Sequence, residues 1–272
     1  MLKNRTFAFA GSDEFCSVIY PFIENEWHLK AVLPSNSSCK SLIQIGEHED
    51  VPNMGWEITS TVADDLVKLG TEVLLISGYP KIIPHDIFSK FKTINIHPSY
   101  LPYGRGIWPQ PSIIYGNFQA AGVTLHKMDK NFDTGNVILR EKVGVEKCEN
   151  LHTLMFKQAI LAETMADNLA TNFDILWQNS REQEKLGTEE APTVPKSINW
   201  SMNVTEIDKI IRSIGQSGVS ANIKNSNLLI FNASIWKQEH RRKIGTLIFD
   251  WGCGPVVAAS DGYVHISDFE SK

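Results

Sequence analysis

The stretch Glu72–Ser77 (EVLLIS) is the clearest strand signal in the chain. It has the length of a β-strand, and its unbroken apolar run lacks the alternation of a strand that faces water on one side. Phe7–Gly11 (FAFAG), Leu29–Leu33 and Thr93–His97 (TINIH) are further strand-length runs, with helical stretches between them. This alternation predicts an α/β domain built on a doubly wound, Rossmann-like and mostly parallel sheet.

Further elements are expected on either side of this run. Ser12 or Asp13 is predicted to cap a helix that continues to about Ile23, because a side-chain oxygen at that position can accept a free backbone N–H. The other elements expected in the same domain are helices at Asp64–Leu69 and Leu151–Leu176 and strands at Val123–Met128 and Val137–Val145.

The character of the chain changes after the long helix. Residues 178–203 are mostly polar and contain Pro192 and Pro195, which predicts a linker between a domain at 1–177 and a second one at 204–272. The second domain is expected to be small, β-rich and OB-like, and to begin with an amphipathic helix at Thr205–Ile214. Its strands are expected at Leu228–Ile235, Gly245–Phe249, Val256–Ala259 and Tyr263–Ser267.

Composition narrows the class of protein. The 272 residues carry a net charge of −5, which argues against a broad nucleic-acid surface because phosphate contacts need clustered Lys and Arg. The four cysteines are scattered and form no C-x-x-C pair, as expected for free thiols in a reducing compartment. No run is long and apolar enough for a membrane helix or a signal peptide, so we expect a soluble, cytoplasmic protein.

The residues that can carry chemistry lie between positions 94 and 135. Asn95 and His97 are two apart in a predicted strand and therefore share a face, near the strand's carboxyl end, where open α/β sheets build their sites. The loop that follows contains Gly104 and Gly106, which let its backbone approach a ligand closely. Asp133 lies in a turn after the next strand, from which it could return towards His97.

These residue types suit amide-forming chemistry without a covalent intermediate. When an amine attacks a formyl carbon, the charge that develops on oxygen can be stabilised by the Asn95 amide, and one such donor is worth roughly 3–4 kcal/mol. His97 can move the proton that the amine releases. Asp133 is expected to fix the tautomer of His97 and to favour its charged form.

In order and spacing, several short motifs resemble the folate-dependent formyltransferases, which include methionyl-tRNA formyltransferase, glycinamide ribonucleotide transformylase and the sugar-nucleotide N-formyltransferases. The motifs are Asn95–Ser99 (NIHPS), Leu101-Pro102 with Arg105-Gly106, Gly122–Thr124 (GVT) and Asp133–Gly135 (DTG). The resemblance covers about residues 5–176, and the region after 204 looks like a short version of the β-barrel domain of tRNA formyltransferases. It implies a formyltransferase catalytic domain at 1–177 and 10-formyltetrahydrofolate as the formyl donor.

The resemblance also assigns residues. The essential Asn, His and Asp of the family correspond to Asn95, His97 and Asp133. Gly78–Ile83 and Asp129–Phe132 match the segments that hold the pterin ring, mainly through their backbone. The residues expected at the folate are Pro80, Lys81, Ile83, Asp129, Lys130 and Phe132. Those expected at the amine substrate are Ser99, Gly104 and Arg105, together with Ser12, because Gly11-Ser12 is similar to a phosphate-binding turn at a helix N-terminus.

The acceptor is expected to be a small-molecule amine, with a nucleotide-linked amino sugar as the first candidate. The region Pro34–Cys39 is short and barely basic, whereas tRNA formyltransferases have a long basic loop there, and Trp108–Pro111 is closer to small-molecule formylators. Hydroxyornithine, a peptide-linked amine and methionyl-tRNA stay as alternatives. A homodimer that pairs through the second domain is a further possibility.

Other interpretations of the same residues stay open. Asn95 could cap a turn, Asp133 could form an Asx-turn, and His126 has an open role that includes support of the site. No metal is expected, because His97, His126 and Asp133 lack a recognisable ligand spacing. A folate-binding module without catalysis and a formyl-folate hydrolase are the alternative classes. The tryptophans of the second domain, Trp200, Trp236 and Trp251, are expected in its core rather than as ligand platforms.

Overall fold

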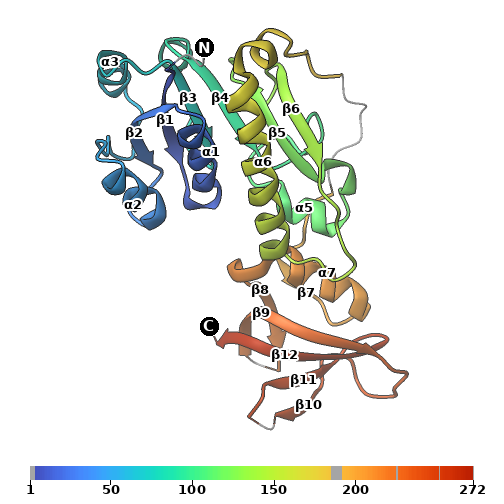
Figure 1. The fold of residues 1–272 in the computed structure, drawn as a ribbon. Helices are drawn as coiled ribbons and strands as arrows, with labels where there is room; N and C mark the ends of the chain where they lie inside the picture. Colours follow the sequence, from blue (N-terminus) through green and yellow to red (C-terminus); the bar gives the residue numbers. More distant parts are fainter. Residues whose placement is uncertain (1–3, 185–191, 225, 251, 272) are drawn as a thin grey trace. The chain divides into compact units, whose positions relative to one another are not determined.

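A computed structural model describes residues 4–184, 192–224, 226–250 and 252–271. The chain divides into two compact units (Figure 1). Unit 1 consists of Met1–Pro109, Gln119–Gly144 and Met155–Glu189, and unit 2 of Gln110–Phe118, Val145–Leu154 and Glu190–Lys272. Two short pieces that precede the end of α6 in the sequence, Gln110–Phe118 and Val145–Leu154, therefore belong to unit 2. The domain boundaries expected at 177 and 203 stay a prediction.

Unit 1 contains a six-stranded sheet in the order β2-β1-β3-β4-β5-β6. The first four pair in parallel, β4 pairs with β5 in antiparallel orientation, and so does β5 with β6. This confirms the expected mostly parallel sheet. The strands are β1 (Thr6–Gly11), β2 (His28–Pro34), β3 (Val73–Ser77), β4 (Lys92–His97), β5 (Gly122–Lys127) and β6 (Val137–Lys142).

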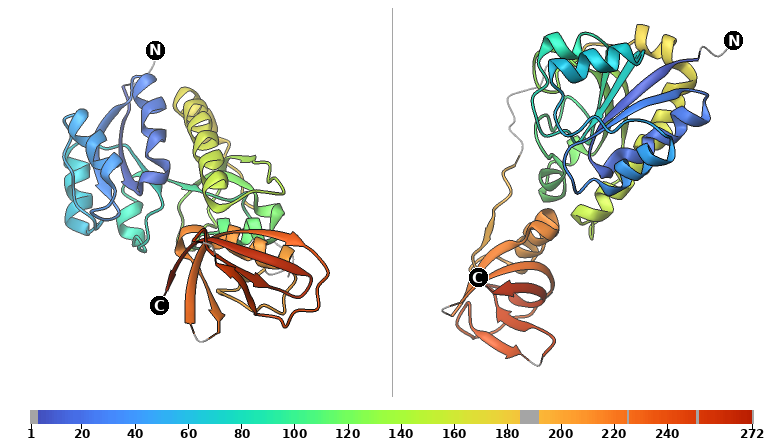
Figure 2. Two further views of the ribbon diagram at one scale, coloured as in Figure 1. Left: turned by 90° about the horizontal axis from the view of Figure 1, so that it is seen from below. Right: turned by 90° about the vertical axis from the view of Figure 1, so that its left-hand side faces the viewer.

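Helices cover both faces of this sheet (Figures 1 and 2). Ile94 and Ile96 of β4 face the apolar cluster formed with α1 (Ile19–Glu24), α2 (Lys40–His48) and α6 (Leu151–Gln178). Asn95 and His97 alternate with these isoleucines, so they point to the opposite face, which α3 (Ser60–Lys68) and α4 (His85–Phe88) cover in part.

The start of the chain differs from expectation. Asp13–Val18 forms a 3₁₀ helix, η1, and the side chain of Ser12 makes no capping hydrogen bond. Asp13 caps a different helix, because its carboxylate accepts the backbone N–H groups of Ser41 (3.1 Å) and Leu42 (2.9 Å) at the start of α2. The predicted helix cap at Ser12 or Asp13 is therefore wrong, and α2 itself was not predicted.

Unit 2 is built around a second six-stranded sheet in the order β10-β11-β12-β9-β8-β7. Its apolar cluster includes Val204, Ile207 and Ile211 of α7 (Val204–Ile214), which confirms the amphipathic helix. The strands are β7 (Ser197–Ile198), β8 (Val219–Ile223), β9 (Ser226–Lys237), β10 (Leu247–Asp250), β11 (Pro255–Ala258) and β12 (Gly262–Ser271), and the remaining helices are α5 (Gln110–Tyr115), η2 (Phe118–Ala120, which continues into unit 1) and η3 (Gly215–Ser217).

The strands β9 to β12 confirm the β-rich second domain, although β7 and β8 were not predicted. Among the described residues, no helix combines the length and the apolar character needed to cross a membrane.

The packing of β1 on β3 gives a stability prediction. A Cβ added to Gly11 would lie 1.8 Å from the carbonyl oxygen of Ser77, which is backbone and cannot swing away. We expect Gly11→Ala to lower the free energy of unfolding by about 1–3 kcal/mol, as overpacking does. Gly144→Ala is the matched control, because nothing lies within 4 Å of its added Cβ. Urea unfolding with unchanged m-values measures the difference, and equal midpoints for the two variants would contradict this account.

Candidate active site

Two adjacent strands present the side chains of the site. Asn95 and His97 lie on one face of β4, and the antiparallel register places His126 of β5 directly opposite Asn95. His97 and His126 are buried, with exposed fractions of 5% and 2%. Asp133 comes from the loop between β5 and β6 and has a positive φ of 52°.

The Asp133 carboxylate is where these side chains meet. Its Oδ1 accepts a hydrogen bond from Asn95 Nδ2 at 3.2 Å and lies 3.6 Å from both His97 Nδ1 and His126 Nε2. Asn95 Nδ2 also lies 3.2 Å from His126 Nε2. The structure therefore brings Asn95, His97 and Asp133 together and adds His126 to them.

The tautomer of His97 is set by a backbone carbonyl. His97 Nε2 lies 2.9 Å from the carbonyl oxygen of Gly104, and because a carbonyl only accepts, Nε2 must carry the hydrogen. In the neutral ring, Nδ1 is then left with its lone pair on the side of Asp133. The expectation that Asp133 fixes the tautomer is corrected in this respect, since Gly104 makes the short contact.

Burial decides the charge of His97. It lowers the pKa of the imidazole below its ordinary value, although the Asp133 carboxylate and the Gly104 hydrogen bond act in the opposite direction. The ring is therefore neutral near pH 7. Asp133 favours the charged form as expected, but its effect is smaller than that of burial.

The Asp133 carboxylate keeps its own charge. Burial raises its pKa, but the contact with His126, the positive charge that His97 gains when it is protonated and the Gly106 N–H together outweigh burial and hold the pKa at about 2. The Gly106 N–H donates to Oδ2 at 2.9 Å. Among the residues that the structure describes, no cluster of His, Cys, Asp or Glu is arranged to hold a metal ion.

The loop after β4 is fixed by hydrogen bonds to itself and to β5. Ser99 is fully buried and its hydroxyl donates to the carbonyl of Tyr103 at 2.7 Å. Thr124 donates to the Ser99 carbonyl and accepts from the Leu101 N–H. Gly104 has φ 72°, and an added Cβ would lie 3.0 Å from Cβ of Ser99. A substrate contact of Ser99 or Gly104 stays a prediction.

The other two residues expected at the substrate lie elsewhere in unit 1. The exposed Arg105 donates to Oε1 of Gln183 at 2.7 and 3.2 Å. Ser12 follows β1, and its hydroxyl is buried without a hydrogen-bond partner in the described part of the chain. It packs against Gly78, where an added Cβ would lie 2.2 Å from Ser12 Oγ. Their contact with substrate also stays a prediction.

The residues expected at the folate fall into two loops of unit 1. Lys81 forms an ion pair with Glu57, and the Ile83 side chain is buried in the core, so only its backbone is available to a ligand. Asp129 accepts the Thr134 hydroxyl at 2.7 Å. Pro80, Lys130 and Phe132 are exposed, and folate contacts for all six residues stay predictions.

Gln183 is a residue of the site's surroundings that the sequence did not reveal. It falls in the region predicted to be a linker, yet its Nε2 donates to the carbonyls of Asp133 (2.8 Å) and Gly135 (2.9 Å). A single amide in a polar run carries no pattern that could have indicated this.

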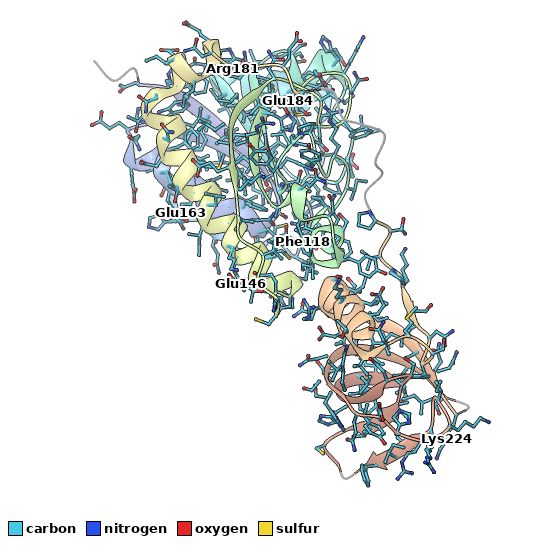
Figure 3. The ribbon with its side chains drawn as sticks, turned by 90° about the vertical axis from the view of Figure 1, so that its right-hand side faces the viewer. Phe118, Glu146, Glu163, Arg181, Glu184 and Lys224 are labelled. Carbon is cyan, nitrogen blue, oxygen red and sulfur yellow. The ribbon has the colours of Figure 1, made fainter. Side chains whose placement is uncertain are left out.

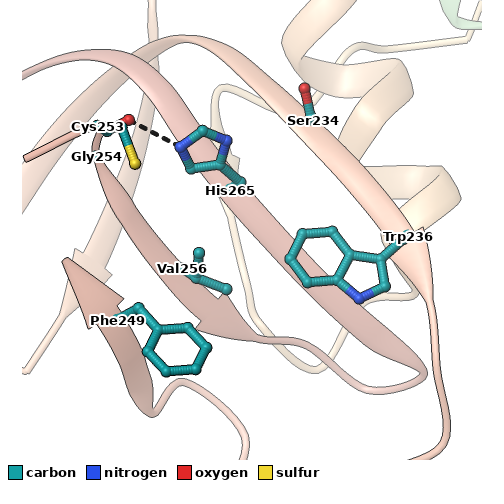
Figure 4. Close-up of a pocket in the computed structure, with 7 residues that line it drawn as sticks. All are labelled: Ser234, Trp236, Phe249, Cys253, Gly254, Val256 and His265. Atoms are coloured by element: carbon teal, nitrogen blue, oxygen red, sulfur yellow. Dashed lines mark hydrogen bonds between the residues drawn. The ribbon is translucent and has the colours of Figure 1, made fainter. Parts of the chain in front are cut away.

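A pocket of about 230 Å³ lies in unit 2 (Figure 4). None of the predicted site residues lines it; its walls are Ser234, Trp236, Phe249, Cys253, Gly254, Val256 and His265. Trp236 is 40% exposed there, so its predicted place in the core is wrong. Trp200 is buried as expected, with its indole N–H on the Asn222 carbonyl, and Trp251 lies outside the described residues.

Two family models match the chain in succession. The model described as formyl transferase matches residues 43–165, which include Asn95, His97 and Asp133, and the model described as formyl transferase, C-terminal domain, matches residues 195–272. Together they account for well over half of the sequence.

Individual relatives agree with these models. The methionyl-tRNA formyltransferase of Caldicellulosiruptor saccharolyticus is 27% identical over 214 residues, which cover 75% of this chain and 68% of that protein. HypX from Aquifex aeolicus, solved with tetrahydrofolic acid, has a similar fold (TM-score 0.71, 16% identity), over 98% of this chain but 44% of HypX.

A third similar structure is the N-formyltransferase from Helicobacter canadensis, in complex with folinic acid and dTDP-3-aminofucose. It has a TM-score of 0.68 and 18% identity, and the match covers 98% of this chain and 99% of that one. The family models thus confirm the resemblance seen in the sequence and the predicted enzyme class, and the chain belongs to the formyl transferase family.

Proposed function

We propose that this chain transfers the formyl group of 10-formyltetrahydrofolate to a primary amine of a small molecule, with a nucleotide-linked amino sugar as the first candidate acceptor. The observation that carries the proposal is the meeting of Asn95, His97 and Asp133 on one face of the sheet, with Nδ1 of His97 3.6 Å from the carboxylate.

The chain's own residues fit the donor. Ile82 and Phe132 expose 73% and 62% of their surfaces in the two loops expected at the pterin, and such apolar surface suits a planar ring. The Gly78 backbone is exposed at the end of β3. The folates in the HypX and H. canadensis structures support the same donor class. When bound, 10-formyltetrahydrofolate supplies an activated formyl group.

Each of these side chains has a part in the proposed transfer. A bond forms between the amine nitrogen and the formyl carbon, and the bond from that carbon to the donor nitrogen breaks. His97 accepts the amine proton at Nδ1, because Nε2 already donates to Gly104, and the proton is then passed to the departing nitrogen. The nearby Asp133 carboxylate stabilises the imidazolium during this step.

Asn95 is the donor for the developing oxyanion. Its amide N–H groups face Asp133 and His126, so one of them must turn towards the formyl oxygen. Such a donor contributes roughly 3–4 kcal/mol to the barrier reduction. His126 limits the positions of the Asn95 amide from the neighbouring strand.

The choice of acceptor rests on charge. Only Ser35–Cys39 connect β2 to α2, and none of these five residues is charged. With a net charge of −5, this argues against the phosphates of tRNA. The dTDP-3-aminofucose bound to the H. canadensis enzyme supports an amino-sugar acceptor. Methionyl-tRNA is the second candidate because relatives found by sequence act on it, and hydroxyornithine or a peptide-linked amine follows.

Turnover should depend on Asn95 and His97. We expect Asn95→Ala and His97→Ala each to lower kcat/KM for amine-dependent tetrahydrofolate release by at least about 100-fold, since each removes a group that acts on the reacting atoms. His28→Ala is the control, because this exposed histidine lies at the start of β2 and outside the site. Full turnover by either site variant would refute the proposed roles.

The same assay identifies the acceptor and separates the alternative classes. The panel contains nucleotide-linked 3- and 4-amino sugars, hydroxyornithine, glycinamide ribonucleotide and charged initiator tRNA. Release of tetrahydrofolate that depends on an amino sugar supports the proposed acceptor. Release that depends only on tRNA would instead identify methionyl-tRNA, the second candidate, as the acceptor. Release without any amine would indicate a formyl-folate hydrolase, and folate binding without release a binding module. The predicted homodimer needs a separate measurement of mass in solution.

The proposed role of His97 also predicts the pH dependence of kcat/KM. Transfer needs neutral His97, so activity falls as pH drops through the pKa of this group, which burial places below its ordinary value of 6.5. Because the Asp133 charge raises the pKa of His97, Asp133→Asn should move the acid limb to still lower pH. A pH–rate profile from about pH 4.5 to 8 measures both midpoints. A wild-type midpoint above 6.5, or an upward shift in the variant, would contradict this assignment.

A further inference from the structure

The residues directly after α6, 179–184, form part of unit 1. Arg181 makes a two-way backbone bridge with Val137 of β6, with N···O distances of 2.8 and 2.9 Å. Glu184 pairs with Arg140 at 3.0 Å. Figure 3 labels Arg181 and Glu184 in unit 1. Residues 181–184 therefore lie along the edge of the sheet that ends in β6, next to the loop that carries Asp133.

Gln183 makes four hydrogen bonds with its side-chain amide. Oε1 accepts from Nε and Nη2 of Arg105, and Nε2 donates to the carbonyls of Asp133 and Gly135. An amide offers two N–H groups and two lone pairs on oxygen, so this set uses its full capacity. Glutamate would lack the donors and leucine would lack both ends, so the environment matches glutamine.

The groups that Gln183 contacts are neighbours of those that fix His97. Arg105 follows Gly104, whose carbonyl accepts the His97 Nε2–H at 2.9 Å. Asp133 places its carboxylate 3.6 Å from His97 Nδ1 and adopts a positive φ of 52°, a conformation that non-glycine residues keep only when their surroundings enforce it. One side chain thus connects the two loops that approach the two ring nitrogens of His97.

We infer that Gln183 is a positioning residue for the formyl transfer, which holds the Asp133 loop and the Gly104–Gly106 loop in register around His97. The inference rests on the proposed function. Gln183 acts through the Asp133 and Gly135 carbonyls, and its loss lets the carboxylate move away from Asn95 and His97. A displacement of about 1 Å in such a site can cost up to 100-fold in rate.

The test compares three variants of the full chain. Gln183→Glu keeps an acceptor for Arg105 but loses the N–H donors to the Asp133 and Gly135 carbonyls. Gln183→Leu loses the acceptor as well as the donors, without adding charge. Glu184→Gln is the matched control, because it changes the next residue and removes only a partly exposed ion pair with Arg140. We expect kcat to fall about 10- to 100-fold in both Gln183 variants and to stay within about 2-fold in the control.

Two readouts separate positioning from a general loss of structure. The Kd for tetrahydrofolate and the melting temperature should stay close to those of the control. Unchanged kcat in either Gln183 variant would overturn the inference. So would a loss of folate binding together with a lower melting temperature, since that pattern indicates damage to the fold.

A spectroscopic measurement keeps this inference distinct from the proposed function. In protein labelled with ¹⁵N-histidine, the Nε2–H signal of His97 reports the hydrogen bond to Gly104 at a fixed pH. We expect that signal to shift or exchange faster with solvent in both Gln183 variants and to stay unchanged in Glu184→Gln. Unaltered signals would refute the positioning role even if the enzyme is active. Altered signals in a protein without formyl transfer would instead refute only the proposed function.

Discussion

The buried carboxylate of Asp133 is the constraint on which the site depends. A charge that is 11% exposed is costly unless hydrogen-bond donors and positive charge surround it. Here the Asn95 amide and the Gly106 N–H donate to it, the imidazoles of His97 and His126 lie 3.6 Å away, and the carboxylate keeps its charge down to a pKa of about 2. Because burying this anion without partners would be costly, β4, the loop with Gly106 and β5 are held around its two carboxylate oxygens.

This arrangement depends on the change from parallel to antiparallel strand pairing at β4. Because β5 runs antiparallel to β4, His126 lies directly opposite Asn95, and the chain can return from β5 through the loop that carries Asp133. The alternation of β4 places isoleucines on the core face and Asn95 and His97 on the other. One strand thus supplies both packing and chemistry without either disturbing the other.

The sequence predicted those parts of the fold that have a strong local signal. Apolar runs such as Glu72–Ser77 locate the central strands, and the spacing of Asn95 and His97 predicts their common face. The short strands β7 and β8 lack such a signal, and α2 begins at a cap supplied by Asp13, 28 residues earlier than its Ser41 partner. A contact between distant residues of this kind leaves no local pattern.

The same limit applies to the site. Asn95, His97 and Asp133 could be predicted because a motif links them, and the structure brings them together. The roles of the Gly104 carbonyl and the Gln183 amide could not be predicted. A backbone oxygen has no sequence signature, and a single glutamine in a polar run forms no recognisable pattern. What the sequence leaves out is the set of contacts that only the folded loops create.

The threading of the chain has a consequence for how the protein can be divided. α5 lies in the first half of the sequence but belongs to unit 2, where Tyr115 packs on the apolar cluster and hydrogen-bonds Glu206 of α7. A protein truncated after α6 would expose the apolar surface of α5. A fragment that starts at residue 190 would lack α5, which packs on its apolar cluster. The C-terminal residues from Glu190 onward therefore cannot be exchanged alone. Chimaeras with related proteins need to include Gln110–Phe118 and Val145–Leu154 with them.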